Sequence, residues 1–231
     1  VVRPMTTLLH GRQACGGTCC HEVGDGEQHS GHCRECDGRP GADEWADLAA
    51  DRAIPSAQAL GVPVVYCHAD TLHEARNGAL EQVTTEWVCF LDADDELEPG
   101  YFDAMAAGSA DVRAPSVRYV RQHRLRAPGM PAVAGHTHQC VAECLVDGNW
   151  LVVGSLVRAD LVRSVGGWRD FDWSEDWDLW LRCHLAGATF EALPEAVYRA
   201  HVRPDSRNRG ASREKRLAAH RAIAAANGLA A

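Results

Sequence analysis

The feature that most restricts the fold of this chain is a short apolar run, residues 86–91, which ends abruptly in Asp92-Ala93-Asp94-Asp95. A run of this length, with aromatic and β-branched residues, predicts a buried β-strand. Three carboxylates within four residues repel one another unless a cation is present. The strand end therefore predicts a site for a hard cation such as Mg²⁺ or Mn²⁺. An acidic surface turn is the alternative.

Strands and helices alternate upstream of this cluster. Apolar runs at 1–10 and 62–68 predict two further strands, and apolar residues at helical spacing predict helices over 43–60 and 71–84. Short connections between such elements are typical of an α/β fold with a mostly parallel sheet flanked by helices. Ligands of these sheets bind beyond the carboxyl ends of the strands, which is where the three aspartates lie.

The rest of the chain is less regular. The pattern predicts a helix over 100–107, strands over 111–120, 150–157 and 196–200, and helices over 174–186 and 212–226. Thr71, followed three residues later by Glu74, has the pattern of a capping box. Glu175 and Asp176 begin the 174–186 helix, where acidic residues favour the helix dipole whatever their function. The functional interpretation is a general base at the floor of a cleft.

Size and composition fit one domain over residues 1–231. The chain is 46% hydrophobic and 24% charged, as in ordinary globular proteins. Its apolar stretches are far shorter than the roughly 20 residues of a membrane span, and no secretory signal is visible at its start. We therefore expect no membrane partner and a cytoplasmic location.

Five of the ten cysteines fall within residues 13–41, a Gly- and His-rich insertion without apolar periodicity. Their spacing is that of a structural Zn²⁺ site, with Cys15, Cys19 or Cys20, Cys33 and Cys36 as ligands and His21, His29 and His32 as alternates. A disulfide pair and free thiols are the other possibilities. A second group, His136, His138, Cys140 and Cys144, also looks metal-like. For that group we favour a loop His pair and buried cysteines.

The formal net charge of −9 hides two basic segments. Residues 112–142 carry five arginines and no acid, and residues 199–221 carry eight basic residues against two acidic ones. The second segment continues into a predicted basic C-terminal helix within 207–231. Such segregation suggests that an anionic ligand meets two basic segments of an acidic body, with ordinary solvated surface as the alternative.

Five blocks follow one another along the chain: Glu-Ala-Arg-Asn-Gly-Ala-Leu (74–80), Trp-Val-Cys-Phe-Leu-Asp-Ala-Asp-Asp-Glu-Leu-Glu-Pro-Gly-Tyr (87–101), Val-Gly-Gly-Trp (165–168), Glu-Asp-Trp-Asp-Leu-Trp-Leu-Arg (175–182) and Tyr-Arg-Ala-His-Val-Arg-Pro-Asp-Ser (198–206). In order and spacing they resemble the signature blocks of family 2 glycosyltransferases. The resemblance covers about residues 62–206 and implies the GT-A fold, a Rossmann-like nucleotide-diphospho-sugar transferase architecture.

The resemblance also implies an activity: metal-dependent, inverting transfer of a sugar, by a hexosyltransferase-type enzyme, from a nucleoside diphosphate sugar that is most commonly UDP-linked. It implies Asp176 as the catalytic base, supported by Glu175. Mn²⁺ or Mg²⁺ would be bound by Asp92, Asp94, Asp95 and His201. The nucleotide sugar would be bound by Thr6, Asp70, Arg76, Asn77 and Asp92.

The chain is more loosely similar to phage glycosyltransferases that modify 5-hydroxymethylcytosine in DNA and are associated with TET-like dioxygenases. This similarity implies double-stranded DNA as a partner and the host cytoplasm as the location. The acceptor contacts would come from Arg118, Arg121, Arg124, Arg207, Arg209 and Trp168. The alternatives are a saccharide, lipid-linked or protein acceptor, and a catalytically dead, zinc-bearing DNA-binding module.

Overall fold

The computed structural model describes residues 5–12, 42–120, 124–126, 142–202 and 212–229, with only the backbone for 5–12, 42–44, 68 and 124–126. The predicted zinc ligands Cys15, Cys19, Cys20, Cys33 and Cys36 lie outside these residues, as do Arg121, Arg207, Arg209, His136, His138 and Cys140. The side chains of Thr6 and Arg124 are likewise not described. These assignments and the single-domain boundaries stay predictions.

One half of the central sheet is parallel. Strand β1 (Met5–Arg12) lies between β2 (Val64–Ala69) and β3 (Trp87–Asp92) and runs parallel to both. The carboxyl ends of β1 and β3 therefore meet at one edge, where His10 is level with Asp92. This half agrees with the alternating pattern of the sequence.

The other half changes direction. Strands β5 (Val112–Tyr119) and β8 (Phe190–Ala200) are parallel, but β7 (Leu156–Arg158) is antiparallel to both β3 and β5. The short strands β4 (Glu96–Leu97) and β6 (Arg124–Arg126) pair antiparallel with β8 and β5. Within the described residues the sheet has the order β2-β1-β3-β7-β5-β8-β4, with β6 on β5. The sheet is therefore mixed, and the expectation of a mostly parallel sheet was wrong.

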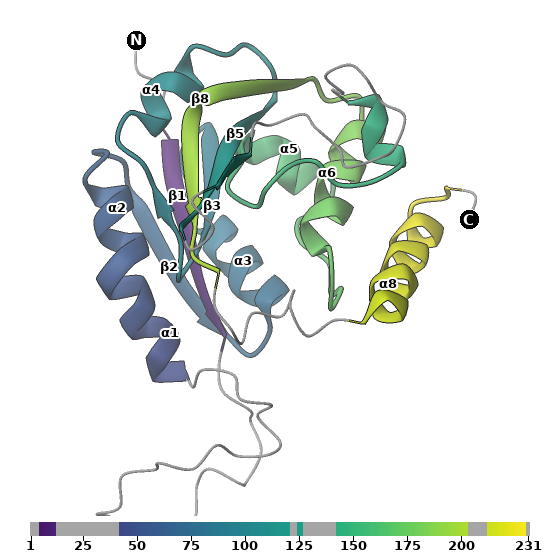
Figure 1. Cartoon of the computed structure of the whole chain (residues 1–231), viewed down its shortest axis with the longest axis horizontal. Helices are drawn as coiled ribbons and strands as arrows, with labels where there is room; N and C mark the ends of the chain where they lie inside the picture. The colour runs from purple at the N-terminus through teal and green to yellow at the C-terminus, as the bar shows by residue number, and fades with distance from the viewer. Residues whose placement is uncertain (1–4, 13–41, 121–123, 127–141, 203–211, 230–231) are drawn as a thin grey trace, which may run out of the picture.

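Helices cover both faces of the sheet (Figure 1). On one face, α1 (Ala42–Leu48), a π-helical segment (Ala49–Ala53) and α2 (Ile54–Gln58) follow one another without a break in helical backbone. On the other lie α3 (Leu72–Glu81), α5 (Ala159–Ser164) and α6 (Glu175–Leu185). Helix α4 (Tyr101–Ala106) packs on β8, and a 3-10 turn spans Glu143–Val146. None of the helices in the described part of the chain is both long and apolar enough to cross a membrane.

Several local signals are confirmed. The Thr71 side chain accepts from the backbone N–H of Glu74, and the Glu74 side chain accepts from the backbone N–H of Thr71, so the capping box forms. Residues 87–91 of β3 are fully buried, and each large apolar side chain buried in this way stabilises the fold by about 1.5–3 kcal/mol. Cys144 is buried as expected, but it is disulfide-bonded rather than a free thiol.

Helix α6 is anchored through a buried aspartate. Asp178 is 0% exposed and accepts from Arg182 at 2.8 and 2.9 Å, from Arg169, and from Asn227 at 3.0 Å. Asn227 follows α8 (Arg213–Ala226), and His220 of α8 also lies on the ring of Trp177, 4.5 Å between centroids. Burial tends to raise the pKa of Asp178, but the hydrogen bonds from Arg169, Asn227 and Arg182 outweigh it and lower that pKa. Asp178 therefore remains ionised and holds α6 and α8 together.

We expect Asp178→Ala to lower the free energy of unfolding by about 3–5 kcal/mol, because the substitution leaves buried guanidinium groups without their carboxylate. In a chain of this size the melting temperature should fall by roughly 6–20 °C, as measured by circular dichroism. Asp51→Ala, at an exposed helical position, is the control and should change stability by no more than about 0.5 kcal/mol. Equal melting temperatures for the two variants would contradict the anchoring role.

Candidate active site

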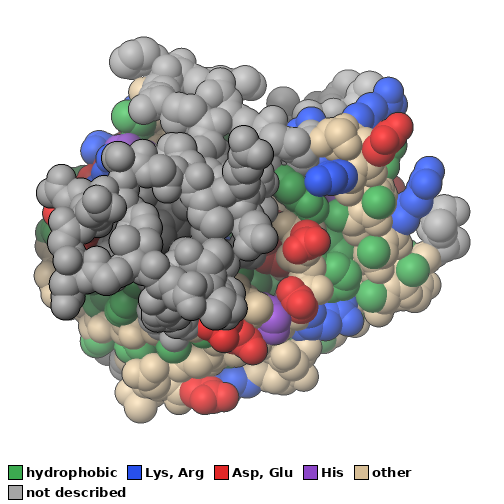
Figure 2. All heavy atoms as spheres, turned by 90° about the horizontal axis from the view of Figure 1, so that it is seen from below, with side chains coloured by type: hydrophobic (Ala, Val, Ile, Leu, Met, Phe, Trp, Pro, Cys, Tyr) green, Lys and Arg blue, Asp and Glu red, His purple; other side chains and the backbone are tan. Residues whose placement is uncertain are grey.

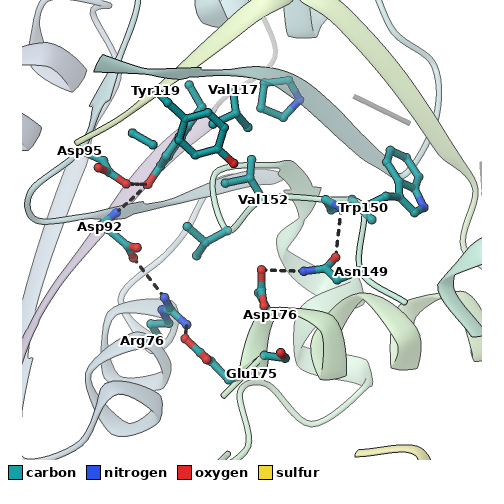
Figure 3. Close-up of a pocket in the computed structure, with 16 residues that line it drawn as sticks. Arg76, Asp92, Asp95, Val117, Tyr119, Asn149, Trp150, Val152, Glu175 and Asp176 are labelled. Carbon is teal, nitrogen blue, oxygen red and sulfur yellow. Dashed lines mark hydrogen bonds and ion pairs between the residues drawn. The ribbon is translucent and has the colours of Figure 1, made fainter. Parts of the chain in front are cut away.

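A cavity of about 340 Å³ lies beyond the end of β3. Its walls come from elements far apart in sequence: the end of β3, strands β5 and β8, the loop before β7 and the first turn of α6 (Figure 3). The polar lining residues are Arg76, Asp92, Asp95, Asn149, Ser174, Glu175, Asp176, Tyr119 and Tyr198. The rest of the lining is apolar, mainly from β5 and residues 150–153. One wall is thus strongly charged and the opposite wall is apolar.

Arg76 of α3 is the charged centre of this cavity. Its side chain is 2% exposed, with Nη2 3.1 Å from Asp92 Oδ1 and Nη1 3.1 Å from Glu175 Oε1. The guanidinium carbon lies 4.1 Å from the ring centroid of Trp168. A buried cation is costly unless it is paired, and here two carboxylates and an aromatic face compensate it. Arg76 therefore ties the end of β3 to the start of α6, as Figure 3 shows.

The ring of Trp168 packs against the guanidinium group of Arg76. The Trp168 side chain is itself 2% exposed and packs against Arg76 rather than lining the cavity, and the acceptor contact predicted for Trp168 stays a prediction. Asn77 fixes its backbone: the Asn77 amide donates to Trp168 O at 2.9 Å and accepts from Trp168 N at 2.8 Å. Gly167 has φ of +69°, and a Cβ there would lie 2.5 Å from Asn77 Oδ1. Both polar groups of the Asn77 side chain are therefore hydrogen-bonded to the backbone of Trp168, and Asn77 does not line the cavity.

Asp176 lies at the start of α6, on the cavity side. Its Oδ2 accepts from Asn149 Nδ2 at 2.8 Å and its Oδ1 accepts from the backbone N–H of Trp177 at 2.9 Å. Burial, and then the negative charge of Glu175, raise the pKa of Asp176 to about 6, while Arg76 and the two hydrogen bonds oppose the rise. A carboxylate with this pKa accepts a proton more readily than an ordinary aspartate does near neutral pH. Asp176 is therefore suited to general base catalysis.

The three aspartates after β3 have different surroundings. Asp92 is paired with Arg76, whereas Asp95 is buried and accepts from the Tyr198 hydroxyl at 2.6 Å and from the backbone N–H of His201 at 2.7 Å. Burial, followed by the charges of Asp94 and Asp92, raises the pKa of Asp95 well above its ordinary value. Asp94 is half-exposed in the turn between β3 and β4. The mutual repulsion expected from the sequence is thus relieved in part by Arg76 and Tyr198.

Within the described residues, no group of three or more His, Cys, Asp and Glu side chains is arranged to hold a metal ion. Nε2 of His201 is 2.6 Å from Glu96 Oε2, so one ring nitrogen of this predicted metal ligand is engaged by Glu96. The oxygen atoms of Asp92, Asp94 and Asp95 are nevertheless the donor type that Mg²⁺ and Mn²⁺ prefer.

Other predicted residues lie away from the cavity. Asp70 is exposed just after β2, and Arg118 is held by a two-pronged ion pair with Glu98, at 2.6 and 3.3 Å. Arg113 is buried, donates to backbone carbonyls and stacks 4.0 Å from the ring centroid of Trp87. The ion pair with Glu98 offsets part of the charge of the basic segment at 112–142.

Four polar residues of the cavity were not predicted from the sequence: Tyr119, Asn149, Ser174 and Tyr198. Asn149 lies directly before the strand predicted over 150–157, and an Asn after Gly148 is a common turn signal. Tyr198 belongs to a signature block but was given no role. Ser174 is the one non-glycine residue of the described chain with positive φ, 58°. Strain of this kind clusters at functional sites, and it was invisible in the sequence.

Two family models match the sequence. The model of Glycosyl transferase family 2 matches residues 44–126, and that of Glycosyl transferase family group 2 matches residues 87–216, more than half of the chain. No curated protein matches the sequence.

Crystal structures of S. aureus TarS are similar in fold. TarS 1–349 in complex with UDP-GlcNAc has a TM-score of 0.54 at 14% identity, over 96% of this chain and 66% of that one. The complex of TarS 1–349 with UDP has a TM-score of 0.53 at 15% identity, over 96% and 64%. A further crystal structure of S. aureus TarS has a TM-score of 0.53 at 16% identity, over 96% of this chain and 39% of that one. This chain thus spans less than two thirds of the TarS structures it matches. From the family models and the shared fold we conclude that the chain belongs to the family 2 glycosyltransferases.

Proposed function

We propose that this protein transfers a glycosyl group from a nucleoside diphosphate sugar to an acceptor hydroxyl, with inversion at the anomeric carbon. The observation that carries the proposal is the position of Asp176, a carboxylate with a raised pKa, in the same cavity as the carboxylates that end β3. A UDP-linked donor is the first choice, since TarS structures of similar fold contain UDP-GlcNAc and UDP.

On the acceptor side, Asp176 takes the proton of the attacking hydroxyl. The acceptor oxygen forms its bond to the anomeric carbon while the bond from that carbon to the diphosphate oxygen breaks. Attack from the face opposite the leaving group inverts the configuration. The diphosphate leaves as an anion, so no second side chain has to protonate it. Glu175 contributes by keeping the pKa of Asp176 high.

On the donor side, we infer that Asp94 and the donor diphosphate together bind Mn²⁺ or Mg²⁺. The carboxylate oxygens of Asp92, Asp94 and Asp95 are the donor type that these cations prefer, and Asp94 is partly exposed in the turn between the other two. Mg²⁺ often uses one or two carboxylates and completes its shell with water and substrate phosphates, so a cage of three side chains is not required. When bound, the cation stabilises the charge that develops on the leaving diphosphate.

For the acceptor we propose 5-hydroxymethylcytosine in DNA, with a saccharide, lipid-linked or protein hydroxyl as the alternative. Helix α8 favours an anionic polymer as the acceptor, because its basic side chains are exposed. These are Arg213, Lys215, Arg216 and Arg221. In Figure 2 Lys and Arg side chains lie on the right of the face, the side on which Figure 1 places α8. The target base would have to leave the stack to reach Asp176.

Asp176→Asn tests the base. The amide cannot accept the proton, so transfer should fall by about 10²–10⁴-fold at pH 7.5, while the fold is retained. In the wild type, kcat/KM should fall about tenfold per pH unit below about pH 6, because protonation of Asp176 removes the base. Radiolabelled sugar transfer and circular dichroism are the measurements. Asp170→Asn, a mostly exposed position, is the control, and a wild-type rate in Asp176→Asn would refute the assignment.

Removal of divalent cations tests the donor side. We expect EDTA to abolish transfer and Mn²⁺ or Mg²⁺ to restore it, and we expect Asp94→Ala to reduce donor affinity in the presence of metal but not the melting temperature. Isothermal titration of UDP with and without Mn²⁺ measures the effect directly. Asp103→Ala, an exposed aspartate of α4, is the control. Full activity in EDTA would remove the metal from the proposal.

A donor panel tests the acceptor. Nucleoside diphosphate sugars are offered with DNA that contains 5-hydroxymethylcytosine or cytosine at the same positions, and products are identified by mass spectrometry. We expect a glycosyl adduct on the hydroxymethylated DNA alone, and weaker DNA binding in an Arg213→Ala/Arg216→Ala variant, because phosphate contacts dominate affinity. Leu217→Ala on the same exposed helix is the control. Transfer to a saccharide acceptor with none to DNA would favour the alternative.

A further inference from the structure

Asn149 is oriented from one side and contacts Asp176 on the other. Its Oδ1 accepts from the backbone N–H of Leu151 at 3.0 Å, and its Nδ2 donates to Asp176 Oδ2 at 2.8 Å. Because a backbone N–H can pair only with the oxygen of the amide, Leu151 fixes which end of Asn149 faces Asp176. The NH₂ group is therefore held toward the carboxylate, as Figure 3 shows.

The loop that carries Asn149 is fixed on both sides. Before it, the Leu145 carbonyl accepts from Trp177 Nε1 at 2.7 Å, so the loop is tied to α6. After it, the Gly154 carbonyl accepts from the hydroxyl of Tyr101 in α4, and a Cβ on Gly154 would lie 2.0 Å from the ring of Tyr198. Leu151 and Val152, between these anchors, line the cavity. The wall of the cavity and the donor to Asp176 are thus parts of one rigid loop.

The two hydrogen bonds of Asp176 act on different oxygens. The backbone N–H of Trp177 occupies one lone pair of Oδ1, and Asn149 occupies one lone pair of Oδ2. A carboxylate held at both oxygens cannot rotate, so its remaining lone pairs keep one direction. The charged groups that act on it are Glu175, which disfavours the carboxylate form, and Arg76, which favours it. Arg76 is shared with Asp92 and Glu175, whereas the Asn149 amide is directed at Asp176.

We propose that Asn149 is a positioning residue for proton transfer: it fixes the rotation of the Asp176 carboxylate and keeps that group ionised, and so couples the cavity loop to the base. This inference rests on the proposed function of Asp176. A neutral loop residue would then set the pH above which Asp176 is ionised and can accept a proton. Without the amide donor, Asp176 would hold a proton at higher pH and would turn more freely.

Asn149→Asp is the sharpest test. The aspartate keeps the shape of the side chain and an oxygen for the N–H of Leu151, but it replaces the donor with a second carboxylate that repels Asp176. We expect the acid limb of kcat/KM to move up by about one pH unit or more. The KM for the donor should stay within about twofold, because Asn149 contacts the base and no donor-side carboxylate in the described structure. Gln58→Glu, the same amide-to-acid change at an exposed site of α2, is the control and should leave the limb in place.

A readout independent of activity separates this inference from the proposed function. The protein is labelled with ¹³C at aspartate carboxyl carbons, the Asp176 signal is assigned by its loss in Asp176→Asn, and it is titrated in each variant. A raised midpoint in Asn149→Asp supports the inference even where no transfer is detected, in which case the proposed function alone fails. An unchanged midpoint overturns the inference. Should Asn149→Asp not fold, Asn149→Ala, which removes the donor without adding charge, is titrated instead with the same expectations in direction.

Discussion

The structure of the site depends on one buried cation. Arg76 sits between Asp92 at the end of β3 and Glu175 at the start of α6, with the ring of Trp168 behind it. A guanidinium this far from water is tolerated only where its charge is matched, so the positions of the two carboxylates and the aromatic ring are set together. Asn77 and Gly167, whose φ is positive, hold the backbone of Trp168 in place, so that its ring stays against Arg76. The strand that ends in the aspartates and the helix that bears Asp176, the proposed base, are thereby joined.

Two nearby aspartates of helix α6 have pKa values that are shifted in opposite directions. Asp176 faces the cavity, where burial and Glu175 raise its pKa to about 6. Asp178, two residues later, points to the other side of α6, where hydrogen bonds from Arg169, Asn227 and Arg182 lower its pKa. One carboxylate is thus prepared to take up a proton and the other to remain a fixed charge. Divergent environments of this kind separate catalytic from structural carboxylates.

Local signals in the sequence predicted the elements that are decided locally. The capping box at Thr71 formed because its partners are three residues apart, and β3 formed because a short apolar run between polar ends has few other solutions. Contacts between residues far apart in the sequence could not be predicted. The apolar run 150–157 reads as a strand, yet only β7 at its end is one, because residues 150–153 are apolar in order to line the cavity rather than to join the sheet. The two hydrogen bonds of Arg76 reach residues that are 16 and 99 positions away in the sequence. Because these partners are not local, the bonds could not be inferred from the sequence.

Pairing also changes what the basic segments mean. Counted along the sequence, 112–142 and 199–221 are both basic, but in the first Arg113 is buried, and Arg118 shares the carboxylate of Glu98 with Arg199. The basic side chains of α8 are, by contrast, exposed. Asn227 ties α8 to Asp178, and Asp178 lies on the same helix as Asp176, the proposed base. A polyanion bound along α8 would thus be fixed relative to Asp176 through two adjoining helices, so electrostatic attraction to the polymer and placement of its hydroxyl would be parts of one rigid assembly.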